Sequence, residues 1–352
     1  MDIEQRERHH QHAIETRTPI MVSLVVPVRD EAATIQTLLD SIAAQSRQPD
    51  EVVFVDGGSV DDTVARLRDA GLRDNRIRVI EAGDATPGRG RNVGIAAARC
   101  EWIALTDAGI RLEPQWLEKL VEAVRRDPAV EVVYGNYEPA AASFFERCAA
   151  LAYVAPKAER PGGRMRGPST ASSLLRREVW EAAGGFPDLR AAEDLIFMER
   201  VRERGCKVAW AAEATVWWQL QPTLGKTFRK FRVYSRHNVR AGWQRYWHYG
   251  VARQYLIGLL GVMLAAAHSP WWLALPVAGF LARVAKSIWM RREGRGVWQL
   301  LNPFQFAGVG IILLAIDLAM FLGWWQVAWK QSLRGQSGNE SGVKIAGRGW
   351  TR

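Results

Sequence analysis

The chain has 352 residues and a formal net charge of +10, with 16 tryptophans but only three cysteines. Cys100, Cys148 and Cys206 lie far apart with no C-x-x-C spacing, which argues against a disulfide framework or a zinc site and predicts reduced thiols. The first residues are charged and lack an apolar run, so we expect no secretory signal and a catalytic part that stays in the cytoplasm.

Charge is distributed unevenly along the chain. Acidic and basic residues alternate up to Glu213, whereas no Asp or Glu occurs between Glu213 and Glu293. That interval carries basic residues interleaved with Trp and Tyr, together with long apolar runs. Basic and aromatic residues together occur in nucleic-acid-binding proteins, but beside apolar segments they are typical of contact with an anionic membrane. We therefore expect a membrane, and no nucleic acid, as a partner.

The first part of the chain alternates strand and helix patterns. Continuous β-branched runs at 21–28 and 51–55 predict strands buried on both faces, and shorter runs at 78–80 and 102–105 predict two more. Helical spacing occurs between them, including 90–98. Alternation with short connections predicts a mostly parallel α/β sheet, whose ligand binds beyond the carboxyl ends of the strands.

Polar residues after the first two strands are expected to cap helices. Asp30 is predicted to cap the helix that contains Ile35 and Ile42, and Ser59, with Asp62 three residues on, is predicted to cap the next. Further along, we expect a strand at 130–134, a helix at 144–154 and, at 161–168, a Gly-, Pro- and Arg-rich loop of the kind that is often mobile.

The predicted domains are a flexible N-terminal tail (1–19), a catalytic domain (20–250), a membrane region (251–330) with helices at about 255–267, 271–289 and 304–329, and a flexible C-terminal tail (331–352). The first two apolar segments are short for a membrane span and meet at His268-Ser269-Pro270, which favours a hairpin or a re-entrant pair. The third is long enough to span and carries Asp317, which we expect to have a structural role, packing against another helix.

The residues at the strand ends have the chemistry of a nucleotide site. Asp56 can accept hydrogen bonds from a base edge, and Gly57 lets the backbone approach the base. Arg89 and Arg91 offer forked donors to a diphosphate, and Asp107 is placed to hold a ribose hydroxyl or a divalent cation. The alternative for Asp56 and Asp107 is a carboxylate that merely satisfies its own turn.

Four segments, in this order, resemble motifs of the family 2 glycosyltransferases with the GT-A fold. They are Val25–Glu31 ("P-x-x-N-E", with Asp30 in place of Asn), Val53–Thr63 ("V-D-D-G-S-x-D-x-T"), Gly90–Gly94 ("A-R-N-x-G"), and Gly184–Pro187 with Ala192–Leu195 ("G-G-F … E-D"). The resemblance covers about 22–240. It implies a GT-A nucleotide-sugar-binding domain with a mixed, mostly parallel sheet, followed here by C-terminal membrane helices.

The resemblance also implies roles and partners. Pro27, Arg29, Glu31 and Asp56 with Gly57 would frame the base and ribose of a nucleoside-diphosphate sugar of the UDP or GDP type. Arg89, Arg91 and Asp107 would lie near its diphosphate. Asp194, with Glu193 beside it, would act as general base in an inverting, single displacement by an acceptor hydroxyl. Because the hydrophobic half of the chain would hold the site at the membrane surface, we expect a lipid or lipid-linked acceptor at the cytoplasmic face of the inner membrane.

Two departures from the family pattern bear on the mechanism. The metal-binding "D-x-D" reads Asp107-Ala108-Gly109, so its second carboxylate is missing. Either a Mg²⁺ or Mn²⁺ is held by Asp107, the diphosphate and waters, which we favour, or a basic side chain compensates, from among Arg89, Arg91, Arg111, Arg232 and His237. The "Q-x-x-R-W" signature of processive members is absent, which favours transfer of a single sugar. The corresponding region is 228–236, whose basic residues we expect to face either the diphosphate or a lipid phosphate.

The sequence is also compatible with functions other than sugar transfer. A catalytically inactive, membrane-tethered protein that binds a nucleotide-sugar or a phospholipid is the main alternative, because the metal-binding Asp is missing. A nicotinamide-dependent oxidoreductase is disfavoured because no G-x-G-x-x-G turn follows the first strand. A nucleotidyltransferase would be identified by release of pyrophosphate.

Overall fold

The computed structural model describes residues 19–294, 296 and 302–334, so the predicted tails at 1–19 and 331–352 lie largely outside the described residues. The strands are β1 (Val22–Val28), β2 (Glu51–Asp56), β3 (Ile77–Glu81), β4 (Trp102–Leu105), β5 (Ile110–Leu112), β6 (Val132–Ala140), β7 (Ala158–Arg160), β8 (Gly163–Met165), β9 (Ser173–Arg176) and β10 (Val208–Gln219). The longer helices of the globular part are α2 (Ile35–Ala43), α3 (Thr63–Arg73), α4 (Pro87–Ala97), α5 (Trp116–Arg126), α6 (Phe144–Tyr153), α7 (Arg177–Ala182) and α8 (Glu193–Glu203). The C-terminal helices are α9 (Leu224–Arg240), α10 (Gln244–Trp247), α11 (Tyr249–Ala267), α12 (Ala274–Met290) and α13 (Pro303–Arg334).

The main sheet has eight strands in the order β3-β2-β1-β4-β9-β6-β10-β5. Strands β3, β2, β1 and β4 run parallel, as do β6 and β10, whereas β9 is antiparallel to both of its neighbours and β5 is antiparallel to β10. The sheet is therefore mixed and mostly parallel, as the sequence predicts. The antiparallel strand β9 separates the four parallel strands β3, β2, β1 and β4 from β6, β10 and β5, and β10 leads to the C-terminal helices.

Two apolar cores hold helices against the two faces of the sheet. On one face α2 and α5 bury Leu38, Trp116 and Leu120 completely. On the other face α4, α7 and α8 contribute Ile95 and Phe197. Because parallel strands are covered on both faces, their β-branched runs are buried along nearly their whole length.

Close packing of α4 on β1 sets the direction of its polar end. A Cβ at position 94 would overlap the side chain of Val25 and lie 3.0 Å from that of Val55. Only glycine at this position lets the helix lie so near the strands. The helix begins at Pro87, with the hydroxyl of Thr86 accepting from the amide of Arg89. This arrangement aims Arg91 inward at the carboxyl end of the sheet.

The predicted capping roles of Asp30 and Ser59 are wrong. The N-cap of α2 is Thr34 and that of α3 is Asp62. Asp30 instead has a left-handed backbone with φ of 54°, and its carboxylate accepts from the amide of Val60 at 2.8 Å. The hydroxyl of Ser59 accepts from the amide of Asp30 at 2.9 Å. These polar residues join the loops after β1 and β2: each accepts from a backbone amide of the other loop and so is not available to cap a helix.

The segment 161–168, predicted as a loop, contains structure. Strands β7 and β8 form an antiparallel hairpin across it, and Arg166 just after the hairpin is 2% exposed. Its guanidinium donates to the carbonyl of Tyr137 at 2.9 Å and to the carboxylates of Glu138 and Glu293. The prediction of a mobile loop from the Gly and Pro content was wrong, because these residues form the tight turn of a hairpin next to a buried arginine.

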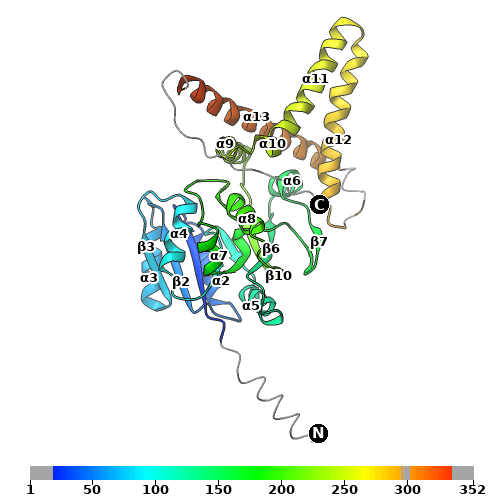
Figure 1. Cartoon of the computed structure of the whole chain (residues 1–352). Coiled ribbons are helices and arrows are strands. Elements are labelled where there is room, and N and C mark those ends of the chain that lie inside the picture. The colour runs from blue at the N-terminus through cyan, green and yellow to red at the C-terminus, as the bar shows by residue number, and fades with distance from the viewer. Residues whose placement is uncertain (1–18, 295, 297–301, 335–352) are drawn as a thin grey trace, which may run out of the picture.

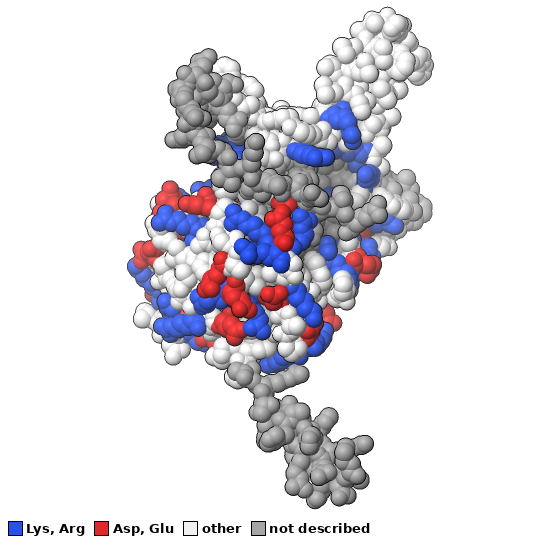
Figure 2. Space-filling view, viewed as in Figure 1, with Lys and Arg blue, Asp and Glu red and all other residues white. Residues whose placement is uncertain are grey.

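Three helices are long and apolar enough to cross a membrane: 249–267, 270–290 and 303–329. The helices α11 and α12 form a hairpin that stands out from the rest of the chain (Figure 1), and in Figure 2 its outer part carries no charged side chains, with basic ones near its base. Asp317 of α13 is 1% exposed and pairs with Arg283 of α12, and it accepts from the hydroxyl of Tyr255 of α11 at 2.9 Å. It therefore has the structural pairing expected from the sequence.

A third apolar core joins the C-terminal helices to the globular part. It contains Leu151 of α6, Phe231 of α9, Ile288 of α12 and Val309 of α13. The hydroxyl of Ser287 donates to the carbonyl of Leu151 at 2.8 Å, which ties α12 to α6. The apolar helices are therefore fixed on the same side of the sheet as its carboxyl ends, where α9 lies below α13 (Figure 1).

Candidate active site

A pocket of about 740 Å³ lies at the carboxyl ends of β1, β2 and β4. The residues that the sequence predicts there and that line it are Pro27, Arg29, Glu31, Gly57, Arg91, Asp107 and Glu193. The opposite wall comes from the end of β10 and from α9. The pocket thus lies between the first four strands and the segment that leads to the apolar helices.

Arg91 is the centre of the polar network in this pocket. Its side chain is 4% exposed, and it donates to the Oε1 of Glu193 at 2.8 Å and to the Oδ1 of Asp107 at 2.6 Å. The flanking carboxylates come from different elements, Glu193 from the first turn of α8 and Asp107 from the turn after β4. A single buried guanidinium therefore holds the acceptor-side motif against the predicted diphosphate region.

The two adjacent carboxylates of α8 differ in their surroundings. Burial raises the pKa of Glu193 to about 7; Arg91 opposes this shift and the charge of Asp194 adds to it. Burial also raises the pKa of Asp194, against the effects of Arg91 and of the Leu195 amide. Asp194 accepts from that amide at 2.8 Å through one oxygen and is half-buried. It forms no ion pair with any described residue, whereas Glu193 is engaged with Arg91.

Asp107 and Glu31 offer carboxylate oxygens to a cation. A Cβ at position 109 would lie 3.8 and 3.9 Å from the two carboxylate oxygens of Glu31, so Glu31 stands near the place of the missing second Asp. Burial and the charge of Asp107 both raise the pKa of Glu31. The described residues contain no group of three or more metal-ligating side chains. The pair suits Mg²⁺ or Mn²⁺ only if phosphate oxygens and waters complete the coordination, as is usual for Mg²⁺.

Of the predicted site residues, Asp56, Arg89 and Asp194 do not line the pocket, although Asp194 directly follows Glu193, which does. Asp56 is 3% exposed, and its carboxylate accepts from the amides of Gly58 and Ser59 at 3.0 and 3.1 Å, so it stabilises its own turn. Arg89 is exposed on α4 and does not line the pocket. Arg29 lines the rim and pairs with Asp84.

The far wall contains residues that the sequence did not single out. Trp218 of β10 and Tyr234 of α9 line the pocket, and the ammonium of Lys230 lies 4.3 Å and 5.4 Å from the centroids of their rings. Arg190, from the loop before α8, lines the rim. The basic residues of 228–236 were expected to face either a diphosphate or a lipid phosphate. The sequence did not indicate which of them reaches the pocket, because a helix from a distant part of the chain has no motif spacing relative to the strand ends.

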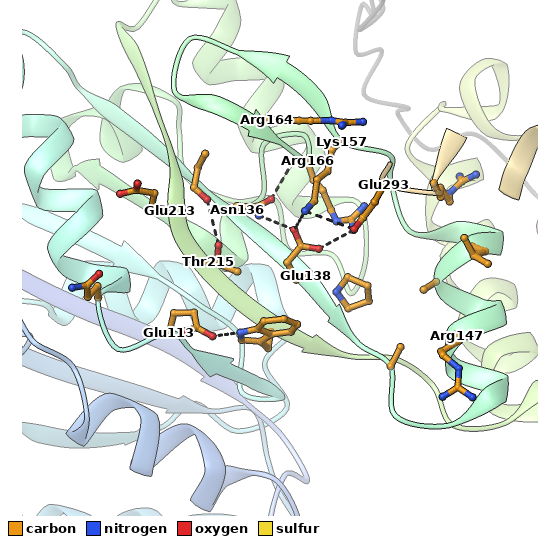
Figure 3. A pocket seen from close by; sticks show the side chains of 18 of the residues that line it. Glu113, Asn136, Glu138, Arg147, Lys157, Arg164, Arg166, Glu213, Thr215 and Glu293 are labelled. Carbon is orange, nitrogen blue, oxygen red and sulfur yellow. Dashed lines mark hydrogen bonds and ion pairs between the residues drawn. The ribbon is translucent and has the colours of Figure 1, made fainter. Parts of the chain in front are cut away.

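A larger cavity, of about 1310 Å³, lies between the sheet and the helices α6 and α12 and contains none of the predicted residues. Figure 3 shows Lys157, Arg166, Glu138 and Glu293 converging on one side of it. These charges neutralise one another, and the guanidinium nitrogens of Arg166 donate hydrogen bonds to carbonyl and carboxylate oxygens of the protein itself. This cavity therefore marks a joint between the globular part and the end of α12 and lacks the chemistry of a transfer site.

Comparisons with known proteins agree with this architecture. The profile described as "Glycosyl transferase family 2" matches residues 23–178, and the one described as "Glycosyl transferase family group 2" matches residues 102–328, more than half of the chain. The mannosyltransferase PcManGT from Pyrobaculum calidifontis, solved in complex with GDP-Man and Mn2+, has 19% identity and a TM-score of 0.51 over 90% of this chain and 94% of its own. That likeness shows the GT-A fold.

Two curated proteins give the most informative sequence matches. The O-antigen chain rhamnosyltransferase RfbN of Salmonella typhimurium is 28% identical over 207 residues, which is 55% of this chain and 65% of that protein. The glycosyltransferase AglE of Haloferax volcanii is 28% identical over 226 residues, 62% of this chain and 73% of that protein. The match therefore spans somewhat less than two thirds of the Salmonella protein. With the two family profiles and the fold, these findings establish that the chain belongs to the family 2 glycosyl transferases.

Proposed function

We propose that this glycosyltransferase moves one sugar from a nucleoside-diphosphate donor to a hydroxyl of a lipid or lipid-linked acceptor, with inversion and with Asp194 as general base. The observation that carries the proposal is the pocket in which Arg91 joins Asp107 to the first turn of α8. It brings the donor-side and acceptor-side motifs to one place, as a single displacement requires.

The surroundings of Asp194 support its role. Burial raises its pKa, which makes its carboxylate a better proton acceptor than that of an ordinary aspartate. One of its oxygens accepts from the Leu195 amide, and the other is not engaged by any described residue. Glu193, by contrast, is held by Arg91, so it positions that arginine and takes no proton from the acceptor.

The leaving diphosphate needs positive charge around it. Asp107, with Glu31 nearby, would hold a divalent cation, which supplies electrophilic stabilisation of the leaving group when bound. Lys230 adds a cation of this chain to the same wall, because the rings beside it, Trp218 and Tyr234, line the pocket. An ammonium that makes no hydrogen bond to any described residue is available for a phosphate oxygen.

The apolar helices support a membrane location. We place the chain in the cytoplasmic (inner) membrane with the catalytic domain facing the cytoplasm, the boundaries being about 20–250 for the catalytic domain and 251–330 for the membrane region. The basic residues near the base of the α11–α12 hairpin fit a cytoplasmic surface (Figure 2). Curated relatives include an O-antigen chain rhamnosyltransferase, which fits a role in the synthesis of an envelope polysaccharide.

Titration of UDP and GDP into the full chain in detergent, with EDTA or with Mn²⁺, tests the donor site. We expect micromolar binding of one of the two, tightening with Mn²⁺, and loss of that gain in Asp107→Ala because the remaining carboxylate cannot hold the cation alone. The exposed Asp69→Ala serves as the control. If neither nucleotide binds under either condition, the transferase proposal fails and an inactive, membrane-tethered binding protein becomes the better description.

Lys230 gives the donor site a pH dependence of defined sign. Burial lowers its pKa to about 8, which the charge of Asp107 partly opposes. Above that pH the free protein must take up a proton to bind an anionic diphosphate, so the affinity for the nucleotide should fall by up to about tenfold per pH unit. Calorimetry between pH 7 and 9 should show a break near pH 8. In Lys230→Arg the break should vanish, and a wild-type profile without a break would contradict the assignment.

A further inference from the structure

The basic face of α9 is not accounted for by the fold or by the donor pocket. Arg232, Arg236 and Arg240 follow one another at four-residue spacing, so they lie along one side of the helix. Within the part of the chain that the structure describes, none of the three forms an ion pair. A row of arginines without carboxylate partners is costly to assemble, because each charge repels the next.

Several nitrogens on this face are buried without a partner. The Nε of Arg232, the Nε of Arg236 and the Nδ1 of His237 have no hydrogen-bond partner among the described residues. Buried donors are nearly always satisfied in folded proteins, so an unsatisfied group calls for a bound ion, a water or a ligand. Three such atoms within six residues of one helix, all belonging to basic side chains, point to an anion.

The charges on this face act on one another and reach the donor pocket. Burial and the charges of Arg232 and Arg240 lower the pKa of Arg236. Burial also lowers the pKa of His237, and the charges of Arg240, Arg236 and then Arg190 lower it further. Arg190 lines the rim of the donor pocket. Because the charge of Arg190 acts on His237, the basic face of α9 lies near the rim of the donor pocket.

A side of α9 adjacent to the basic face is fixed against the apolar helix α13. A Cβ at Gly323 would lie 2.6 Å from the Cβ of Ser235 and 2.7 Å from the carbonyl oxygen of Arg232, so the two backbones are in direct contact. The hydroxyl of Ser235 also donates to the carbonyl of Met320 at 2.7 Å. The helix α9 is thus held directly on the membrane-type helix α13, next to the globular part of the chain (Figure 1).

We propose that the basic face of α9, formed by Arg232, Arg236, His237 and Arg240 and extended by Arg190, binds the phosphate or diphosphate group of a lipid-linked acceptor. The proposal rests on the proposed function and names the chemistry of its second substrate. Guanidinium forks match phosphate oxygens, and several of them in a row suit a diphosphate better than a single phosphate. The lipid chain would lie along the apolar helices, whose exposed residues include Tyr255 and Leu256 of α11.

This placement explains how an acceptor would reach the base. The phosphate group would bind between the membrane helices and the pocket rim at Arg190, and the sugar attached to it would extend toward Asp194. No covalent step takes place at the basic face. Its residues position the acceptor, so their loss should weaken acceptor binding and leave the donor site intact.

Farnesyl diphosphate, a short polyprenyl diphosphate, is a suitable probe for the full chain in a neutral detergent. We expect it to bind the wild type and to bind Arg236→Gln/Arg240→Gln about 10- to 100-fold more weakly, through loss of two charge-assisted contacts. Arg245→Gln is the matched control, because Arg245 is exposed on the neighbouring α10 and should leave the affinity unchanged. Farnesol should show no difference between the proteins.

Two results would overturn the inference. The first is equal affinity of the double variant and the wild type for farnesyl diphosphate. The second is full competition by phosphatidylglycerol in nanodiscs at equal lipid concentration, which would assign the face to general contact with the bilayer surface. Binding of UDP or GDP is measured in parallel: the double variant should retain it, which also shows that the variant is folded. Failure of the wild type to bind any nucleotide would instead count against the proposed transferase function, whatever the lipid result.

Discussion

Asp194→Asn should lower kcat for sugar transfer by about 10²- to 10⁴-fold while leaving nucleotide binding unchanged, because the loss of a general base removes that much of the rate. Asparagine keeps the shape and the contact with the Leu195 amide but takes up no proton. In the wild type, kcat should fall on the acid side at a higher pH than an ordinary aspartate would give, since burial raises the pKa of this group. The measurement is single-turnover transfer from the donor identified by titration.

The variant Glu193→Gln distinguishes the role of Glu193 from that of the neighbouring Asp194. Glutamine still accepts from Arg91, so the network survives, and we expect a much smaller change in kcat than for Asp194→Asn. The acid limb of the pH–rate profile should persist in Glu193→Gln. If Glu193→Gln proves the more damaging of the two, the assignment is reversed, and the carboxyl group with a pKa of about 7 is the base.

Arg91→Met should destabilise the fold by about 3–5 kcal/mol, because removal of one partner from a buried ionic cluster leaves the others uncompensated. The arginine is 4% exposed and holds Asp107 and Glu193 together. Without it, the buried Glu193 loses its cationic partner, so the pKa of Glu193 should rise above its present value. Unfolding in detergent can be followed by intrinsic fluorescence, which the 16 tryptophans make strong.

Arg68→Met is the comparison for that experiment. Arg68 forms an ion pair with Glu81 in which the two side chains are 63% and 55% exposed, and such surface pairs contribute about 0–1 kcal/mol. We expect the unfolding midpoint of Arg68→Met to stay close to that of the wild type. Similar midpoints for the Arg91 and Arg68 variants would show that the buried cluster does not hold α8 in place.

The sheet was predictable because parallel strands that are buried on both faces have continuous apolar, β-branched runs in the sequence. The runs at 21–28 and 51–55 became β1 and β2 with little change at their ends. The third apolar helix was recognised by its length, but the first two, expected to be short for a membrane span, are 19 and 21 residues long and long enough to cross. Helix starts were less predictable. Asp30 and Ser59 have the chemistry of caps, yet their partners are each other's loops, and contacts across 29 residues leave no local pattern.

Only part of the candidate site could be predicted from the sequence, for a related reason. Arg91, Asp107 and Glu193 belong to segments with motif spacing, and the structure brings them together. Lys230 and Tyr234 belong to a helix that reaches the pocket only because α9 crosses α13 at Gly323. Since that crossing depends on one small residue some 90 positions later, nothing near Lys230 in the sequence indicates its neighbours.

The pairing of Arg283 with Asp317 has a consequence for the biogenesis of the protein. An ionised side chain near the middle of a span costs about 2.5–3.5 kcal/mol during insertion, and Asp317 lies near the middle of 303–329. In the proposed membrane-embedded protein, α12 would enter the bilayer with a bare guanidinium and α13 with a bare carboxylate. Each cancels the other's charge only when both are present. Translation of α13 therefore completes the insertion of α12, and a chain cut short before residue 303 would retain a hairpin whose second arm is poorly anchored.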